Sequence, residues 1–253
     1  MRTPKSKRLK PKAKLRPLTK GEWELKSGHP SLRIAGVDEV GRGCLAGPVV
    51  AAAVVLRPDA FIAPPKWVRR VTDSKLLSPE ARAELAPQIR EWVWVWAIGS
   101  ASVEEIDEIN IYHASHLAMC RAVNEVHAQL LALEMALAGL FDSASAGSTP
   151  STSGSSRGLH HVLVDGNVIP RALGFPATAI IQGDSRALSI ACGSILAKVH
   201  RDQQMTELDS VYPGYEFSAH KGYGTPAHQR ALAKLGASPI HRRSFGPVAE
   251  VIR

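Results

Sequence analysis

The chain has 253 residues, 45% of them hydrophobic and 21% charged, which is enough for one large domain or two small ones with a buried core. No apolar run reaches the roughly 18 residues of a membrane span, and the basic N-terminus lacks the apolar segment of a secretory signal. The cysteines, Cys44, Cys120 and Cys192, fit neither a disulfide framework nor a CxxC metal site, so we expect a cytoplasmic protein.

The net charge of +8 is concentrated at the N-terminus, because residues 1–20 contain nine Lys or Arg and no Asp or Glu. Three prolines in this stretch oppose helix, so we predict a disordered basic tail over residues 1–30 and one folded domain over 31–253. Such a tail adds non-specific affinity for phosphate backbones. It could equally be a solubility tail or the result of a translation start placed too far upstream, and the charge pattern leaves these alternatives open.

In the first half of the domain, Leu32–Val37 and Val49–Leu56 are apolar runs joined by a glycine-rich turn, which predicts two buried strands. Trp92–Ile98 is a third candidate strand, with Trp92, Trp94 and Trp96 on one face as core residues. Ser78-Pro79-Glu80 predicts the start of a helix near 79–90. Ser102 and Glu105 form a capping-box pattern, and residues 102–140 are predicted to be helical throughout.

In the second half, residues 142–158 form a Ser/Gly-rich stretch, which predicts a flexible insertion. Two strands are expected at His161–Val164 and Ala177–Ile181, and Ser185 is expected to cap a helix that reaches about Leu208. A helix over Pro226–Leu235 should stop at Gly236. The order of elements predicts an α/β domain with a mixed sheet and a helical segment at about 205–253.

Carboxylates follow three of the expected strands: Asp38 with Glu39, Asp165, and Asp184. Active sites of open α/β sheets lie at the carboxyl ends of strands, and four carboxylates there would raise each other's pKa unless a cation lies between them. Oxygen ligands without His or Cys suit Mg²⁺ or Mn²⁺, and a pair of such ions supports in-line attack on a phosphodiester. Because Asp38 and Glu39 are adjacent in a strand, they should point to opposite faces unless the strand ends or twists there.

The segment Gly41–Gly47 has the spacing G-x-G-x-x-x-G and leads into a strand, so it does not match a dinucleotide-binding loop. Gly41 and Gly43 are better suited to a close approach of the backbone to a ligand, such as a ribose 2′-hydroxyl. Arg42 could pair with a phosphate or with a neighbouring carboxylate. His113 and His116 share a helix face without an acidic or Cys partner, and we interpret them as packing or surface residues.

Eight blocks between about residues 33 and 248 resemble, in order, the motifs of type II ribonucleases H. They are Ala35–Gly43 (AGVDEVGRG), Asp73–Lys75 (DSK), Glu105–Ile111, Val164–Asn167 (VDGN), Gly183–Ser185 (GDS), Ser194–Asp202, His220–Thr225 (HKGYGT) and Arg242–Phe245 (RRSF). The usual DSKKL reads DSKLL here, which removes one basic residue.

The resemblance implies a ribonuclease H-like catalytic domain over 31–253, with a mixed five-stranded sheet, flanking helices and a C-terminal helical extension. It implies that Asp38, Glu39, Asp165 and Asp184 hold two divalent ions, Mn²⁺ or Mg²⁺, and that Gly41, Arg42 and Gly43 read the 2′-hydroxyl. The cut would fall 5′ to a ribonucleotide in an RNA–DNA hybrid or in duplex DNA, leaving 5′-phosphate and 3′-hydroxyl ends.

Tyr223 would stack on the sugar of the following deoxynucleotide, although from its glycine neighbours alone it could equally pack in the core. Lys75, Lys198, Lys221, Arg242 and Arg243 are candidate phosphate contacts. We expect a monomer. Two other functions remain to be separated by experiment: a metal-dependent nuclease that also cuts all-DNA substrates, and a hybrid-binding protein without catalysis.

Overall fold

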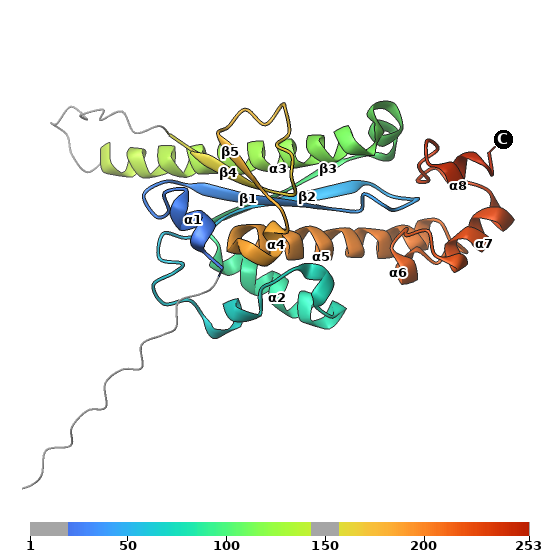
Figure 1. Ribbon diagram of the computed structural model, residues 1–253, viewed down its shortest axis with the longest axis horizontal. Coiled ribbons are helices and arrows are strands. Elements are labelled where there is room, and N and C mark those ends of the chain that lie inside the picture. The colour runs from blue at the N-terminus through green and yellow to red at the C-terminus, as the bar shows by residue number, and fades with distance from the viewer. Residues whose placement is uncertain (1–19, 143–156, 253) are drawn as a thin grey trace, which may run out of the picture.

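A mixed sheet between two helical layers forms the centre of the computed structural model, which describes residues 20–142 and 157–252 (Figure 1). The strands of this sheet lie in the spatial order β3-β2-β1-β4-β5, with β1 antiparallel to β2 and parallel to β4. The strands are β1 (Ile34–Val40), β2 (Val49–Val55), β3 (Val95–Ala101), β4 (His161–Asp165) and β5 (Ala177–Ile180). The expected α/β class and five-stranded mixed sheet are confirmed.

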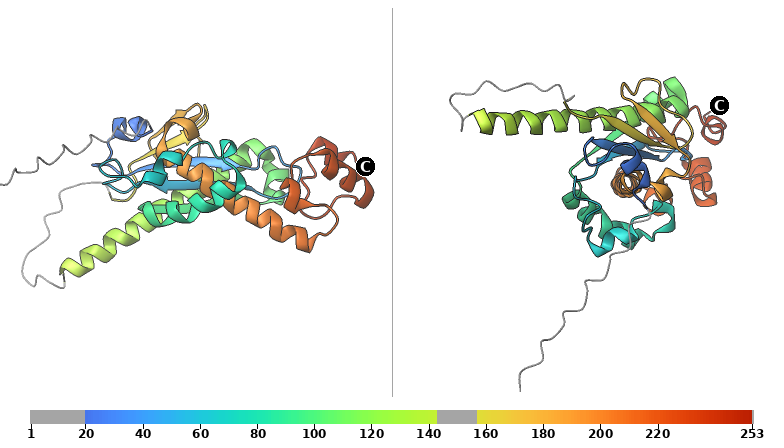
Figure 2. Two further views of the ribbon diagram at one scale, coloured as in Figure 1. Left: turned by 90° about the horizontal axis from the view of Figure 1, so that it is seen from below. Right: turned by 60° about the vertical axis from the view of Figure 1, so that its left-hand side comes forward.

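Helix α3 covers one face of the sheet, and α5 with α2 covers the other (Figure 1). The shorter helices α6, α7 and α8 gather at one end of the molecule, beyond the sheet (Figure 2). The helices are α1 (Glu22–Lys26), α2 (Pro79–Trp92), α3 (Val103–Asp142), α4 (Gly183–Arg186), α5 (Leu188–Val211), α6 (Phe217–His220), α7 (Pro226–Leu235) and α8 (Gly246–Ala249), with 3-10 turns at Lys66–Arg70 and Ser74–Leu76. Within the described ranges, no helix combines the length and apolar character needed to cross a bilayer.

Two glycines allow the helices to approach the sheet closely. A Cβ on Gly36 would lie 2.4 Å from the backbone nitrogen of Ile190 in α5. A Cβ on Gly99 would lie 2.2 Å from the carbonyl oxygen of Ala118 in α3. Because real Cβ atoms do not approach backbone this closely, both helices need glycine beneath them.

Three sequence predictions of helix boundaries follow from local capping and are confirmed. The Ser78 side chain accepts the backbone N–H of Ala81 at the start of α2. Ser102 and Glu105 satisfy each other's backbone N–H groups, at 2.9 and 3.2 Å, as a capping box requires. Helix α7 begins at Pro226 and ends before Gly236, whose φ is 77°.

Other boundary predictions were wrong. The third strand begins at Val95, because Trp92 ends α2 and Trp94 lies between the two elements, so the three tryptophans do not share a strand face. The helix over 102–140 breaks at Asn110 (φ 65°), whose side chain caps the next turn by accepting N–H groups from Tyr112 and His113. Ser185 does not cap a long helix, since its hydroxyl donates to Gln182 O within the short α4.

The basic tail predicted over residues 1–30 is ordered at its end, because α1 spans Glu22–Lys26 and Glu24 is fully buried. Glu24 accepts the Ser189 backbone N–H and hydroxyl, at 2.8 and 2.7 Å, at the start of α5. Residues 1–19 and most of the predicted insertion, 143–156, lie outside the described residues.

Candidate metal centre

Asp38 and Asp165 lie side by side on neighbouring strands. The parallel ladder pairs Val37 with Val164, so the next residues along it are the two aspartates. Val37 and Val164 face the layer of α3, and side chains alternate along a strand, so Asp38 and Asp165 face α5.

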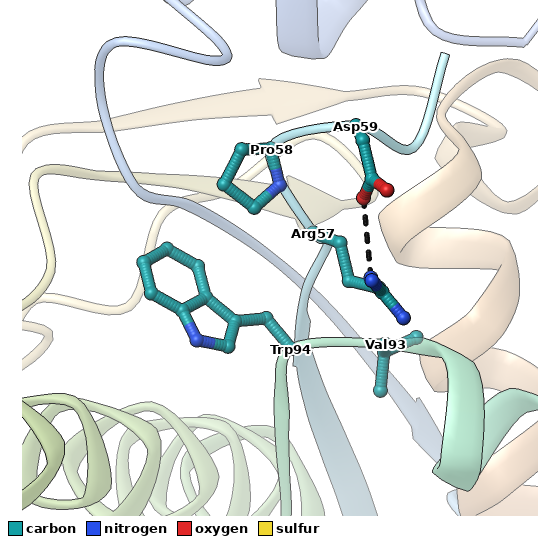
Figure 3. Close-up of a pocket in the computed structure, with 5 residues that line it drawn as sticks. All are labelled: Arg57, Pro58, Asp59, Val93 and Trp94. Carbon is teal, nitrogen blue, oxygen red and sulfur yellow. Dashed lines mark hydrogen bonds and ion pairs between the residues drawn. The ribbon is translucent and has the colours of Figure 1, made fainter. Parts of the chain in front are cut away.

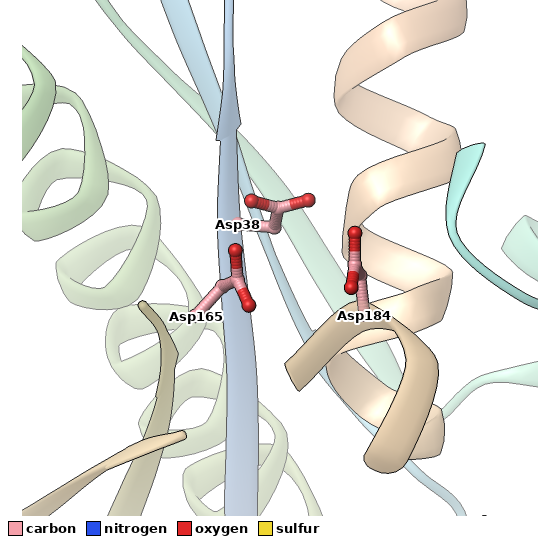
Figure 4. Close-up of side chains that lie close together, drawn as sticks. All are labelled: Asp38, Asp165 and Asp184. Carbon is pink, nitrogen blue, oxygen red and sulfur yellow. The ribbon is translucent and has the colours of Figure 1, made fainter. Parts of the chain in front are cut away.

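Asp184 completes the cluster from α4, which follows β5. One carboxylate oxygen from each of Asp38, Asp165 and Asp184 lies within 4.8 Å of the other two, and Figure 4 shows the three side chains close together. Gly183 fixes the approach of α4, because its backbone N–H donates to Asp165 Oδ1 at 2.6 Å. Three separate elements thus bring three carboxylates to one point.

The cluster is electrostatically unfavourable without a cation. Asp38 is 7% exposed, and burial followed by the nearby carboxylates of Glu39 and Asp165 raises its pKa well above the usual range. Burial, then the charge of Asp165, raises the pKa of Asp184 to about 6. A divalent cation between the carboxylates would offset both their mutual repulsion and the cost of burying their charges. An all-oxygen ligand set suits Mg²⁺ or Mn²⁺. The residues therefore fit the expected metal.

Glu39 does not join the three aspartates. It follows Asp38 in the strand, so its Cβ lies on the α3 side of the sheet, but its carboxylate lines the same pocket as Asp38, with Oε1 3.1 Å from Arg42 Nη1. Burial raises the pKa of Glu39 although Arg42 opposes this shift. Arg42 therefore pairs with a neighbouring carboxylate here, one of the two alternatives that its sequence position left open.

A pocket of 190 Å³ adjoins the cluster and is lined by eight of the thirteen residues predicted for the site. Those eight are Asp38, Glu39, Gly41, Arg42, Gly43, Lys75, Lys198 and Tyr223, and Val40, Ser74 and Ser194 complete the lining. Asp165 and Asp184 belong to the carboxylate cluster. Lys221 lies elsewhere, since its ammonium donates to the Thr206 hydroxyl at 2.6 Å.

The lysines of the pocket lie close to charged or aromatic partners. Lys198 Nζ is 2.7 Å from Asp202 and 5.6 Å from the centre of the Tyr223 ring. Burial alone would lower the pKa of Lys75, but the carboxylates of Asp38 and Asp73 outweigh it and hold that pKa above its usual value. Tyr223 is 39% exposed, so its ring is accessible at the rim.

The prediction that Arg242 contacts a phosphate was wrong. It is fully buried, and its guanidinium donates to the carbonyl oxygens of Gly47, Arg42 and Gly41 at 3.0, 2.9 and 2.7 Å. Arg201, equally buried, donates to carbonyls of Pro48, Ala46 and Lys221 at 3.0, 3.0 and 2.8 Å. Together the two arginines hold the loop between β1 and β2 against the C-terminal segment.

Sequence reasoning gave no site role to Arg201, Ser194 or Asp73. The Ser194 hydroxyl donates to the Ser74 hydroxyl at 2.9 Å, and Ser194 opposes the rise in the pKa of Asp38. Asp73 is a further carboxylate close enough to raise the pKa of Asp184. All three occur in blocks that resemble the family, and that position was the only signal in the sequence.

A second hollow, of 420 Å³, lies beyond the far end of β2 and is lined by Arg57, Pro58, Asp59, Val93 and Trp94 (Figure 3). Its charged groups pair with each other, since Arg57 Nε lies 3.1 Å from Asp59 Oδ1. It contains one carboxylate, which is already paired, so it offers no comparable metal site.

Comparison with known proteins gives one consistent result. The Ribonuclease HII family model matches residues 35–137 and 154–248. A protein from Hyphomonas neptunium named Ribonuclease HII is 49% identical over 220 residues, covering 87% of this chain and 96% of its own. One of the same name from Laribacter hongkongensis is 46% identical over 217 residues, covering 85% and 92%. The crystal structure of ribonuclease H2 from Pyrococcus horikoshii is similar in fold, with a TM-score of 0.57 and 23% identity over 87% of this chain and 97% of that one.

Proposed function

Because the chain belongs to the ribonuclease HII family, an endoribonuclease family, we propose that it hydrolyses the RNA strand of RNA–DNA hybrids and nicks duplex DNA on the 5′ side of an embedded ribonucleotide. The products would carry 5′-phosphate and 3′-hydroxyl ends. The observation that carries this proposal is the meeting of the Asp38, Asp165 and Asp184 carboxylates beside a pocket lined with lysines and a tyrosine.

The three aspartates, with Glu39 from the same pocket as a fourth ligand, would hold two divalent ions, Mn²⁺ or Mg²⁺. Such a pair supplies charge stabilisation to both the attacking and the leaving oxygen of a phosphodiester. The raised pKa values of Asp38 and Asp184 support this assignment, because burial and mutual repulsion outweigh the nearby positive charge of Lys75. Ser194, from the same pocket, favours the ionised form of Asp38 that a metal ligand requires.

The Gly41–Gly43 backbone is proposed to read the 2′-hydroxyl. Gly41 has φ 94°, and a Cβ on it would lie 2.2 Å from Arg201 Nε, so its glycine has a packing reason. Packing does not require glycine at position 43, because nothing lies within 4 Å of where a Cβ would be placed. Open space before a pocket-lining backbone supports close approach of a ribose. Arg42 is half-exposed and can contact a phosphate from its place beside Glu39.

Three further residues are proposed to bind the substrate. The ammonium groups of Lys75 and Lys198 suit phosphate oxygens at the pocket rim. The exposed ring of Tyr223 suits stacking on the sugar of the following deoxynucleotide. The position of Lys221 outside the pocket does not support direct contact at the cut, so its role would be limited to the backbone farther along the duplex.

The test uses a labelled DNA duplex with one ribonucleotide, an all-DNA duplex of the same sequence, and Mn²⁺, Mg²⁺ or EDTA. We expect metal-dependent nicking 5′ to the ribonucleotide, no cut in the all-DNA duplex, and loss of at least about a thousandfold in rate for Asp38→Asn and Asp165→Asn. Asp59→Asn, an exposed carboxylate in the second hollow, is the matched control and should retain the wild-type rate.

Two results would contradict the proposal. Cutting of the all-DNA duplex would identify a broader metal-dependent nuclease. Binding of the ribonucleotide duplex and of a long hybrid by folded protein, without any cut in either metal, would identify a binding protein.

A further inference from the structure

Three buried histidines lie behind Tyr223, outside the metal centre. His228 and His241 are fully buried, and His220 is 9% exposed. The rings of His220 and His228 stack with their centres 4.3 Å apart, and His228 Nε2 lies 3.0 Å from His241 Nε2. The network's hydrogen-bond partners among the described residues are backbone groups, the Ser238 hydroxyl and one another.

The backbone partners determine which ring nitrogen carries each proton. The Ser238 backbone N–H donates to His241 Nδ1 at 2.9 Å, so the proton of neutral His241 is on Nε2 and is donated to His228 Nε2. His228 must then carry its own proton on Nδ1, which donates to the Tyr223 carbonyl oxygen at 2.9 Å. A directed chain therefore runs from Ser238 through two rings to the backbone of Tyr223.

The loop before Tyr223 adopts a conformation that needs such support. Lys221 and Gly222 both have left-handed φ, 54° and 82°, which is unfavourable for the lysine. His220 Nδ1 accepts the Gly222 N–H at 3.2 Å, and the Lys221 carbonyl accepts from Arg201 at 2.8 Å. The Tyr223 carbonyl accepts from Thr225 N–H, at 2.8 Å, as well as from His228, so both of its lone pairs are used.

We propose that His228, held in one tautomer by His241, is a positioning residue that sets the place of the Tyr223 ring and thereby the preference for a deoxynucleotide after the ribonucleotide. This inference rests on the proposed function, because it takes Tyr223 as the residue that contacts that sugar. His228 itself is buried and touches no substrate. Its effect passes through one hydrogen bond to the Tyr223 backbone.

Two substitutions of His228 test the contributions of its two ring nitrogens separately. The amide of His228→Asn lies near the place of Nδ1 and can still donate to the Tyr223 carbonyl, whereas the amide of His228→Gln reaches the place of Nε2 and cannot. The quantity measured is the ratio of kcat/KM on an RNA–DNA junction to kcat/KM within an all-RNA strand of a hybrid. We expect His228→Gln to lower this ratio about tenfold and His228→Asn to keep it within about twofold. His200→Gln, an exposed histidine of α5, is the control.

A double substitution tests whether His228 acts through Tyr223. In a Tyr223→Ala background the ratio should already be low, and adding His228→Gln should change it no further. The affinity for the junction duplex in EDTA, measured by fluorescence anisotropy, should likewise fall in His228→Gln and in Tyr223→Ala, and fall no further in the double variant. If the His228 variants do not fold, two His241 variants replace them. His241→Gln can still donate to His228 and should leave the kcat/KM ratio unchanged, whereas His241→Leu cannot donate and should lower it.

A wild-type ratio in folded His228→Gln, or an equal loss with and without the Tyr223 ring, would overturn the positioning role. Failure of the proposed function is a separate result, because wild-type protein would then cut neither substrate.

Discussion

At the scale of single residues, Asp184 of the proposed metal site is expected to lower the stability of the metal-free protein. It is 7% exposed, and burial, then the charges of Asp165 and Asp73, raises its pKa to about 6. A carboxyl whose pKa is higher in the folded than in the unfolded chain favours folding while it is protonated. That contribution is lost as pH rises through the folded pKa, so at pH 8 the ionised group opposes folding.

We therefore expect Asp184→Asn to stabilise the metal-free protein while abolishing the cut. The asparagine amide removes the repulsion and can donate to Asp73, so the free energy of unfolding in EDTA at pH 8 should rise by about 1–3 kcal/mol. Urea unfolding at pH 8 and pH 4 measures this, and the advantage should shrink at pH 4 because the wild-type carboxyl is then largely protonated. A variant less stable than wild type at pH 8 would show that Asp184 is not destabilising.

At the scale of elements, sequence reasoning succeeded where the signal is local. Ser78 and Ser102 cap helices through residues three positions away, and Gly236 directly follows the last residue of α7, so a short window contains each signal. The strand pattern with its terminal carboxylates likewise predicted Asp38 and Asp165 beside each other. The break at Asn110 had a local signal too, because asparagine is a favoured N-cap, but the long apolar repeat around it suggested an unbroken helix.

The remainder of the site depends on contacts between distant segments, which no local pattern contains. Arg201 and Arg242 resemble solvated or phosphate-binding arginines in the sequence, yet both are buried and bind carbonyls of the β1–β2 loop. The burial of Glu24 was likewise not predictable from local sequence, because its partner Ser189 is 165 residues away.

Glu24 gives a prediction about α5, which has no side-chain cap of its own. A carboxylate at a helix N-terminus satisfies free N–H groups and interacts favourably with the helix dipole. We expect Glu24→Ala to lower the free energy of unfolding by about 2 kcal/mol. Glu22→Ala, on the same helix with an exposed ion pair to Lys26, should change it by less than about 0.5 kcal/mol. Equal losses in chemical denaturation would show that the contact to α5 contributes nothing specific.

At the scale of the whole molecule, the C-terminal helices and the sheet meet at the β1–β2 loop. Arg242 donates to three carbonyls of that loop, and the backbone of Arg242 donates to Leu45 O at 2.8 Å. The pocket beside the carboxylates is lined by residues of both the β1–β2 loop and the C-terminal segment, so it depends on their docking. The proposed metal site is built from β1, β4 and α4, whereas the proposed specificity for ribose depends on this junction.

We expect Arg242→Lys to disturb the proposed reader of the 2′-hydroxyl more than the metal site. A lysine cannot reproduce the fork of three donors, so kcat/KM on the one-ribonucleotide duplex should fall at least about tenfold, with a loss of stability of about 2 kcal/mol. Arg243→Lys, its exposed neighbour, should have little effect on either quantity. If Arg242→Lys keeps full kcat/KM in steady-state assays, the loop does not depend on this arginine.

Every functional conclusion depends on the Asp38, Asp165 and Asp184 carboxylates acting together as one cation site. Calorimetric titration of Mn²⁺ into the wild type, each single Asn variant and Asp59→Asn tests this without any substrate. We predict that each of the three site variants weakens binding at least about tenfold, which is about 1.4 kcal/mol, while Asp59→Asn binds as the wild type does. Wild-type affinity in all three site variants would contradict the metal site and, with it, the proposed chemistry.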